Sequence, residues 1–266
     1  MGELVFIGLG LQDERSISLR GLEEARQCDH VFAEFYTNLM PDLSMQKLEG
    51  LLGKTVHILS RTQVEEDPMG QILTHAKTGR VAILVSGDPM IATTHIELRL
   101  LAEKNGVKTS LVHSSSIYTV AAATVGLQLQ KFGRAITLPI MEGDAFPESP
   151  YDFLAQNKKL GLHTLALLEN RPDGRYLSIR DALQALKNIS NKRNDDLLEE
   201  ETLVVGLARV DSSSKMVRGN LLGELMSLDF GGPPHALIIP GGLHFKEAEA
   251  LEVFAGVPHP LLEAYL

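Results

Sequence analysis

Apolar runs of strand length alternate with helix-like segments through the first 112 residues of the chain. Turn-forming residues bound the runs, and the segments between them carry apolar residues at helical spacing. Such alternation is typical of a parallel sheet covered by helices. The expected strands are residues 4–7, 30–33, 55–59, 81–85 and 109–112.

Two of the intervening helices have distinctive features. Residues 16–28 place Leu19 and Leu22 at helical spacing, which predicts an apolar face that packs on the sheet. Thr94 and Glu97 have the spacing of a capping box, in which two side chains satisfy backbone N–H groups at the start of a helix. We therefore expect one helix over residues 16–28 and another that begins at Thr94.

The pattern of apolar residues changes after residue 113, where the apolar runs become longer and alternate less regularly with helix-like segments. A mixed, partly antiparallel sheet is expected there. The sequence thus predicts an α/β protein with a parallel-sheet N-terminal domain, residues 1–113, and a mixed-sheet C-terminal domain, residues 114–266. The expected strands of the second domain are residues 135–139, 163–168, 202–210 and 235–240, and its expected helices are residues 116–125, 151–159, 179–189 and 246–254.

Three segments of the second half lack apolar periodicity. Residues 191–201 and 211–215 are charged runs, which are typical of solvated loops. Residues 141–150 contain Gly143 and two prolines and are too irregular for a helix or strand. A loop of this length either covers a binding cleft or simply connects two elements.

Two glycine patterns stand where expected strands end. Glycine lacks the Cβ atom that would obstruct a tight turn, and in open α/β sheets ligands bind at such strand ends. Gly8 and Gly10 alone fit a purely structural turn equally well. A dinucleotide-binding fingerprint would need a small residue where Asp13 stands, so we exclude a nicotinamide or flavin cofactor. The patterns read Phe6-Ile7-Gly8-Leu9-Gly10 and Val85-Ser86-Gly87-Asp88-Pro89-Met90.

Composition narrows the function classes. The chain has 266 residues with a formal net charge of −9 and no broad basic face, which argues against nucleic-acid binding. The single cysteine, Cys28, cannot form an intramolecular disulfide, and neither a membrane span nor a secretory signal is evident, so we expect a cytoplasmic protein. The nine histidines lack metal-ligand spacing, and we expect no metal.

Several short stretches of the sequence are similar to those of a known family. On the basis of these stretches the chain resembles, over nearly its whole length, the diphthine synthases, which belong to the tetrapyrrole-methylase class of S-adenosylmethionine-dependent methyltransferases. The Gly-Asp-Pro turn marks the class, and the other stretches indicate the family. These stretches are Phe6-Ile7-Gly8-Leu9-Gly10-Leu11, Val31-Phe32-Ala33-Glu34-Phe35-Tyr36-Thr37, Gly87-Asp88-Pro89 with Ala92-Thr93-Thr94-His95, Ser116-Ile117-Tyr118, Lys131-Phe132-Gly133 and Pro233-Pro234-His235.

One stretch departs from the wider class. After Gly10 the chain continues Leu11-Gln12-Asp13-Glu14, where the class commonly has a Pro-Gly-Asp-Pro ending. The departure itself resembles the diphthine synthases, and it weakens assignment to cobalamin or siroheme enzymes.

The resemblance implies a methyl-donor site in a cleft between the two domains. Apolar residues there suit the purine and ribose, and a serine hydroxyl can form a hydrogen bond. Asp88 has an alternative role as a turn or cap residue, and His235 as a buried structural histidine. The implied contacts of S-adenosylmethionine, which leaves as S-adenosylhomocysteine, are Leu11, Asp88, Ile91, Ser116, Ile117, Leu168, Ala208 and His235.

The resemblance also implies the reaction. The substrate would be translation elongation factor 2 whose target histidine carries a 3-amino-3-carboxypropyl group, and the amine would be methylated successively to give diphthine. No catalytic residue is assigned, because the sequence singles out no base. Two alternatives stay open: an enzyme of the same fold that methylates a tetrapyrrole or ribosomal RNA, and a non-catalytic donor-binding scaffold protein.

A homodimer is implied as well. The apolar residues of the 30–39 region would either contribute to its interface or be buried inside one subunit. The sequence does not distinguish these two interpretations.

Overall fold

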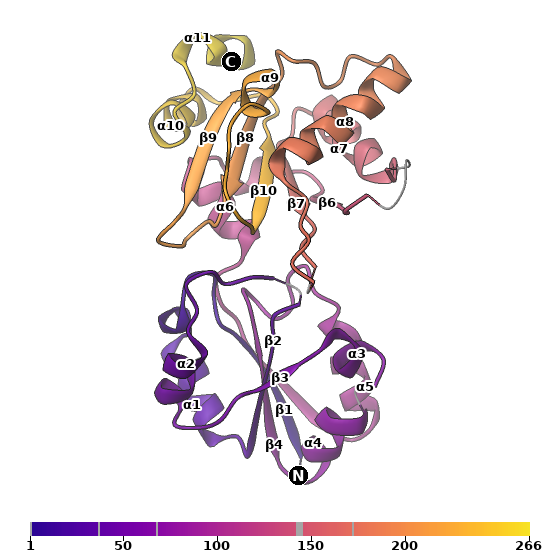
Figure 1. Ribbon diagram of the computed structural model, residues 1–266, viewed down its shortest axis with the longest axis vertical. Helices are drawn as coiled ribbons and strands as arrows, with labels where there is room; N and C mark the ends of the chain where they lie inside the picture. Colours follow the sequence, from indigo (N-terminus) through magenta and orange to yellow (C-terminus); the bar gives the residue numbers. More distant parts are fainter. Residues whose placement is uncertain (1, 37, 68, 142–145, 172) are drawn as a thin grey trace. The chain divides into compact units, whose positions relative to one another are not determined.

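The computed structural model describes residues 2–36, 38–67, 69–141, 146–171 and 173–266. The chain forms two compact units, each with its own five-stranded sheet (Figure 1). The loop expected at residues 141–150 lies partly outside the described residues. Unit 1 comprises Met1–Ile117 and Asp211–Ser213, and unit 2 comprises Tyr118–Val210 and Ser214–Leu266.

The sheet of unit 1 is parallel, as predicted. Its strand order is β3-β2-β4-β1-β5. In a parallel sheet of this kind both faces are buried, and strand residues alternate between the two faces. Most strand residues are therefore buried, which is why the strands appear in the sequence as continuous apolar runs. Val31, Phe32 and Ala33 are buried in this unit, so burial within one subunit accounts for them. The strands are β1 (Glu3–Gly8), β2 (His30–Glu34), β3 (His57–Leu59), β4 (Arg80–Val85) and β5 (Lys108–Val112), and all four pairings are parallel.

Helices cover both faces of this sheet (Figure 1). Val5 and Ile7 of β1 pack in one apolar cluster with α1 and α2, whereas Leu4 and Phe6 pack in another with α4 and α5. The helices of unit 1 are a 3₁₀ turn (Glu14–Ser16), α1 (Leu19–Gln27), α2 (Met45–Leu52), α3 (Arg61–Glu65), a π-helical turn (Met69–Leu73), α4 (Thr74–Thr78) and α5 (His95–Lys104).

The predicted helix over residues 16–28 is shorter than expected. Ser18 caps α1 by accepting a hydrogen bond from the Gly21 N–H at 3.0 Å, so the helix begins only at Leu19. The prediction that Leu19 faces the sheet is wrong, because its side chain is 80% exposed in the first turn. Leu22 and Ala25 form the face that packs on the sheet.

The predicted capping box at the start of α5 is also wrong. Thr94 occupies the cap position, but its side chain makes no cap hydrogen bond. Its hydroxyl instead donates to Glu65 Oε1 of α3 at 2.7 Å. A tertiary partner has therefore replaced the local one that the spacing suggested.

Strand order creates a topological switch between β1 and β4. These strands are neighbours, but the chain leaves β1 toward β2 and leaves β4 toward β5, on opposite sides of the pair. The helices that follow them, α1 and α5, lie in the clusters on opposite faces. Loops that diverge in this way open a crevice at the carboxyl ends of the strands, where ligands bind in α/β proteins.

Unit 2 has the predicted mixed sheet, in the order β6-β7-β10-β8-β9. Only β6 and β7 pair in parallel. The sequence did not predict β9, whose Arg218-Gly219-Asn220 segment weakens the apolar pattern. The strands are β6 (Ile136–Leu138), β7 (Thr164–Leu168), β8 (Leu203–Ala208), β9 (Met216–Leu221) and β10 (His235–Ile239).

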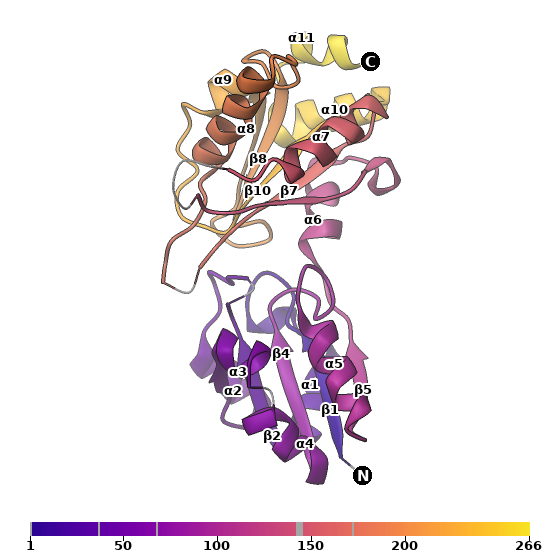
Figure 2. The ribbon, with the colours of Figure 1, turned by 90° about the vertical axis from the view of Figure 1, so that its right-hand side faces the viewer.

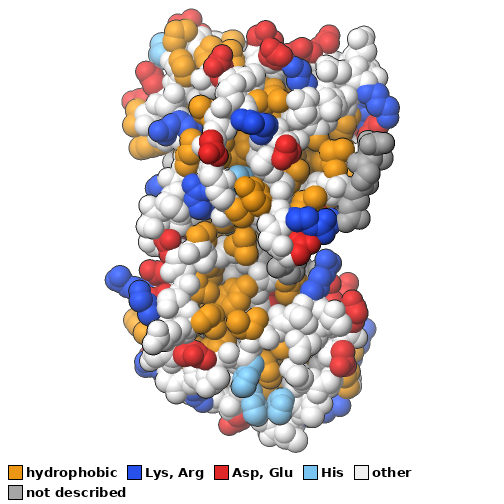
Figure 3. Space-filling model, viewed as in Figure 1, with side chains coloured by type: hydrophobic (Ala, Val, Ile, Leu, Met, Phe, Trp, Pro, Cys, Tyr) orange, Lys and Arg blue, Asp and Glu red, His pale blue; other side chains and the backbone are white. Residues whose placement is uncertain are grey.

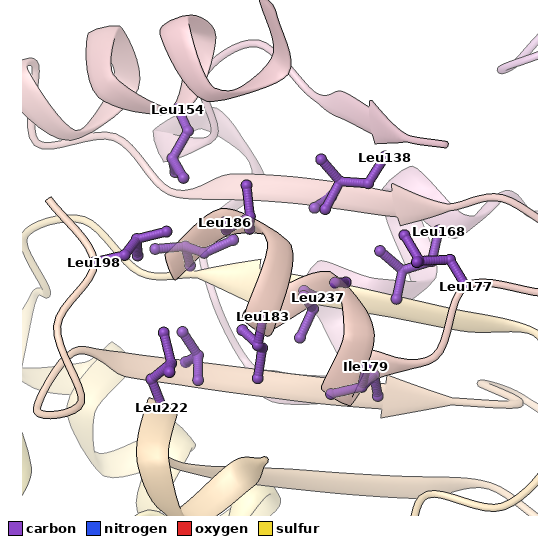
Figure 4. Packing of buried hydrophobic residues seen from close by; sticks show 14 of the residues in the cluster. Leu138, Leu154, Leu168, Leu177, Ile179, Leu183, Leu186, Leu198, Leu222 and Leu237 are labelled. Atoms are coloured by element: carbon purple, nitrogen blue, oxygen red, sulfur yellow. The ribbon is translucent and has the colours of Figure 1, made fainter. Parts of the chain in front are cut away.

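In unit 2, α8 lies on one face of the sheet and α6 and α10 lie on the other (Figures 1 and 2). Leu183 and Leu186 of α8 point into a core shared with Leu237 of β10 (Figure 4). α8 continues to Arg193, so the loop expected from residue 191 begins later, at Asn194 in the left-handed conformation. The helices are α6 (Ile117–Val125), a 3₁₀ turn (Leu129–Lys131), α7 (Ser149–Lys159), α8 (Ile179–Arg193), α9 (Leu222–Leu225), α10 (Phe245–Ala255), α11 (His259–Leu262) and a 3₁₀ turn (Glu263–Tyr265).

A buried carboxylate joins distant segments of unit 2. Glu247 of α10 is 1% exposed and accepts hydrogen bonds from the backbone N–H groups of Gln128 and His244. The Lys131 ammonium pairs with the same carboxylate, and His163 Nε2 lies 3.1 Å from it. Burial raises the pKa of Glu247, but the N–H group of His244, the Lys131 ammonium and the other donors outweigh it and lower the pKa to about 2.

We predict that Glu247→Gln lowers the free energy of unfolding by about 2 kcal/mol at neutral pH, because an amide cannot satisfy all of these donors. The folded-state pKa is depressed, so the stabilisation is complete above the unfolded-state value of about 4.3 and is lost as pH falls toward 2. Denaturant titrations between about pH 7 and pH 3 should show a flatter pH dependence in the variant. Glu249→Gln, at an exposed position of the same helix, is the control and should behave like the wild type.

Candidate ligand-binding site

The loops after β1 and β4 are joined through their backbones. The Gly10 N–H donates to the Gly87 carbonyl at 3.2 Å, and the Gly87 N–H donates to the Gly10 carbonyl at 2.8 Å. Both glycines have a positive φ, of 76° and 75° respectively, which other residues rarely adopt. A Cβ at Gly8 would lie 2.6 Å from the Gly87 carbonyl oxygen. Glycine is required here because two backbones meet without room for side chains.

Asp88 ties this pair of loops to the segment after β5. Its Oδ1 accepts a hydrogen bond from the Met90 N–H at 3.0 Å, and its Oδ2 accepts one from the Ser114 N–H at 3.1 Å. His113 Nδ1 lies 2.8 Å from Oδ2. The carboxylate, 5% exposed, therefore performs the turn role that the sequence offered as an alternative to ligand contact.

The other site residues expected in unit 1 lie on the same three loops. A Cβ at Gly87 would contact Leu11 Cδ2 at 3.5 Å, and the Ile91 N–H donates to the Asp88 carbonyl. Ser116 is buried on the segment after β5, and Ile117 follows it as the first residue of α6. Ile91, 41% exposed, offers apolar surface. Five residues that are distant in sequence thus gather around the switch between β1 and β4.

The three expected residues of unit 2 lie at one edge of its sheet. Leu168 ends β7, Ala208 ends β8 and His235 begins β10, which runs antiparallel to both. His235 pairs in register with Ala208. Leu168 and Ala208 are both buried in the core cluster, and Ala208 is 0% exposed.

The ring nitrogens of His235 are left free to form hydrogen bonds with a ligand. It is 6% exposed, and neither ring nitrogen makes a hydrogen bond of normal geometry among the described residues, although the backbones of Gly231 and Gly232 lie close enough to act on its pKa. The Tyr176 ring packs edge-on against it at 5.4 Å. Burial, assisted by the Arg209 guanidinium, lowers the pKa of His235, so the imidazole is neutral at neutral pH. Buried polar groups are normally satisfied, so a neutral imidazole without partners is suited to a polar ligand.

Sequence reasoning missed one residue of the crevice. Ser86, the last residue before the Gly87 turn, has a buried hydroxyl without a hydrogen-bond partner in the part of the chain that the structure describes. The feature of the sequence that could have identified Ser86 is its position within the Val85 to Met90 pattern. This hydroxyl, the glycine backbones and the apolar side chain of Ile91 together fit a ligand with both polar and flat apolar parts.

Histidines also gather elsewhere in unit 1. The rings of His30 and His75 lie 4.0 Å apart, and Phe32 separates them from His57; Figure 3 shows histidines grouped on one face of the molecule. Within the described ranges, no group of three histidine, cysteine, aspartate or glutamate residues is arranged to hold a metal ion. Nor does any helix there have the length and apolar character needed to cross a membrane.

Comparison with known proteins places these features in context. Residues 3–196 match the family model of the tetrapyrrole (corrin/porphyrin) methylases. The diphthine synthase of Methanothermobacter thermautotrophicus is 41% identical over 261 residues, 98% of each chain. That of Methanosarcina acetivorans is 42% identical over 265 residues, again 98% of each chain. A crystal structure of diphthine synthase, 34% identical, superposes with a TM-score of 0.89 over 99% of this chain and 100% of that one.

We predict that Asp88→Ala lowers the stability of unit 1 by about 1–3 kcal/mol, because it leaves two backbone donors without their acceptor. Thermal unfolding measures the effect. Asp173→Ala is the control, since Asp173 pairs only with its exposed neighbour Arg175 in the described structure and should cost little. Equal melting temperatures of the two variants would contradict the structural role of Asp88.

Proposed function

Since the chain belongs to the tetrapyrrole methylases and, among them, to the diphthine synthases, we propose that it transfers methyl groups from S-adenosylmethionine to elongation factor 2. The chain is a methyltransferase of diphthamide biosynthesis. The acceptor in this proposal is the amine of the 3-amino-3-carboxypropyl group on the target histidine. The observation that carries the proposal is about 41% identity to diphthine synthases along nearly the whole chain.

The residues present suit the methyl donor. Ser86 and His235 offer unsatisfied polar atoms for ribose, amino or carboxylate groups, and Ile91 and Ile117 offer apolar surface for the purine. We assign donor binding to Leu11, Asp88, Ile91, Ser116, Ile117, Leu168, Ala208 and His235, with Ser86 added. When bound, S-adenosylmethionine supplies a methyl group activated by a positively charged sulfonium.

The protein contributes to the reaction mainly by aligning the methyl donor with the acceptor amine. An activated electrophile needs no covalent intermediate with the enzyme, and correct orientation of the two reactants accounts for much of the rate. The two joined glycine loops provide a backbone surface with little freedom to move, because each is hydrogen-bonded to the other. His235 is neutral, so it does not repel a cationic donor. The amine attacks only when it is neutral, so a proton must leave it before each transfer.

The decisive test is transfer of labelled methyl from S-adenosylmethionine to elongation factor 2 that carries the aminocarboxypropyl-histidine. We expect label on the modified factor alone, and mass spectrometry will count the methyl groups added. Unmodified factor is the control. Donor binding without label would contradict the proposed acceptor; tetrapyrrole and ribosomal RNA acceptors would then be tested, and failure of these would favour a scaffold protein.

We also propose a homodimer that acts in the cytoplasm and needs no nucleic-acid contact. Three exposed apolar side chains on α10 support the dimer: Phe245, Val253 and Phe254 are each 58–69% exposed. The net charge of −9 disfavours contact with phosphates.

For the dimer, we expect light scattering to give twice the 29.1 kDa mass of one chain. Val253→Asp should shift the protein toward the monomer, because a charge beside the exposed apolar side chains of α10 opposes association. Leu19→Asp, at an exposed site on unit 1, is the matched control and should leave the mass unchanged. A monomeric wild type would refute the dimer.

A further inference from the structure

A buried histidine holds the loop after β4. His95, at the start of α5, is 0% exposed, and its Nδ1 lies 3.1 Å from the Pro89 carbonyl oxygen. The Thr93 hydroxyl donates to the same oxygen at 2.8 Å. Because a carbonyl can only accept, Nδ1 must carry a proton.

The other ring nitrogen faces a buried carboxylate. His95 Nε2 lies 3.6 Å from Oε1 of Glu34, which ends β2 and is also 0% exposed. Glu34 is the register partner of Val85, the residue that precedes the loop. Its Oε2 accepts a hydrogen bond from the Tyr36 N–H at 3.2 Å. The pair lies beside the Phe6 ring, in the apolar cluster of that face.

This second contact, between Nε2 and Glu34, is an electrostatic one and not a hydrogen bond, because 3.6 Å is too long for a hydrogen bond and Nε2 has no hydrogen-bond partner among the described residues. The hydrogen bond that fixes the ring is the one between Nδ1 and the Pro89 carbonyl. Glu34 lies on the Nε2 side of the ring and so restricts the orientation in which that bond forms.

The loop needs such support. Gly87 and Ala92, on either side of Pro89, have positive φ values of 75° and 56°. Left-handed backbone at a residue other than glycine persists only where the surroundings hold it in place. The donors on the Pro89 carbonyl come from Thr93 and His95, and only His95 is anchored to a different strand of the sheet, through Glu34.

We propose that Glu34 and His95 are positioning residues that hold the Pro89 carbonyl and thereby set the Ser86–Ile91 loop for methyl-donor binding. The inference rests on the proposed function, because it takes this loop as part of the donor site. Neither side chain contacts the donor; they act through the loop backbone.

Two substitutions of His95 separate the two bonds. In His95→Asn the amide nitrogen replaces Nδ1 and keeps the bond to Pro89, whereas in His95→Gln the longer amide replaces Nε2 and keeps only the contact with Glu34. We expect S-adenosylhomocysteine, titrated calorimetrically, to bind His95→Asn within about threefold of wild type and His95→Gln about tenfold more weakly. Glu34→Gln keeps a side chain of the same size beside Nε2 and leaves the bond to Pro89 in place, so it should also bind within about threefold.

A second pair of variants avoids the buried side chains. Thr93→Val removes the other donor to the Pro89 carbonyl and should weaken binding about fivefold. Thr94→Val is the matched control, because its hydroxyl bonds to Glu65 rather than to the loop, and should bind as wild type does. With S-adenosylmethionine as substrate, KM should rise in Thr93→Val and His95→Gln while kcat changes little.

Thermal unfolding of each variant accompanies the titrations. Donor affinity that follows melting temperature rather than the Pro89 bond would overturn the inference, as would wild-type affinity in both Thr93→Val and His95→Gln. Wild-type protein that does not bind S-adenosylhomocysteine would instead refute the proposed donor site, so the two failures are distinguishable.

Discussion

The contact between the backbones of Gly10 and Gly87 is the constraint on which the candidate site depends. It exists because the strand order places β1 beside β4 while the chain leaves these strands in opposite directions. Because Gly8 has no side chain and Gly10 and Gly87 adopt a positive φ, the two turns approach closely enough to exchange two hydrogen bonds. The position of Leu11 beside Gly87 follows from this approach.

Buried carboxylates secure segments within each unit, each in a different way. Asp88 is satisfied mainly by backbone donors and connects the loops after β4 and β5. Glu247 is surrounded by donors and a lysine, which keeps it ionised and makes it a structural link of unit 2. Glu34 lies on an apolar face, accepts a hydrogen bond from the Tyr36 N–H and lies beside the His95 ring. The three carboxylates thus differ in which segments they connect and in which donors they meet.

The fold and the family contribute different parts of the functional conclusion. A switch-point crevice lined by glycine is compatible with many small ligands, because folds host unrelated chemistries. The unsatisfied Ser86 hydroxyl and His235 imidazole indicate that the ligand carries polar groups. The reaction itself comes from the similarity to diphthine synthases along nearly the whole chain.

Local chemistry in the sequence determined much of the architecture. Apolar runs such as residues 81–85 are buried strands because nothing polar interrupts them, and Gly10 and Gly87 mark turns that other residues rarely form. One prediction failed because a distant partner competed with a neighbour: Thr94 bonds to Glu65 instead of capping its helix. Another failed for a local reason: Ser18 caps α1, so Leu19 lies in the exposed first turn. The sequence by itself determined the two sheets, the glycine turns and the family. Only the tertiary structure decided that the Asp88 carboxylate serves the loop, that His235 lacks partners and that Glu34 meets His95, because hydrogen bonds between segments far apart in the chain depend on strand order and register, which no local pattern encodes.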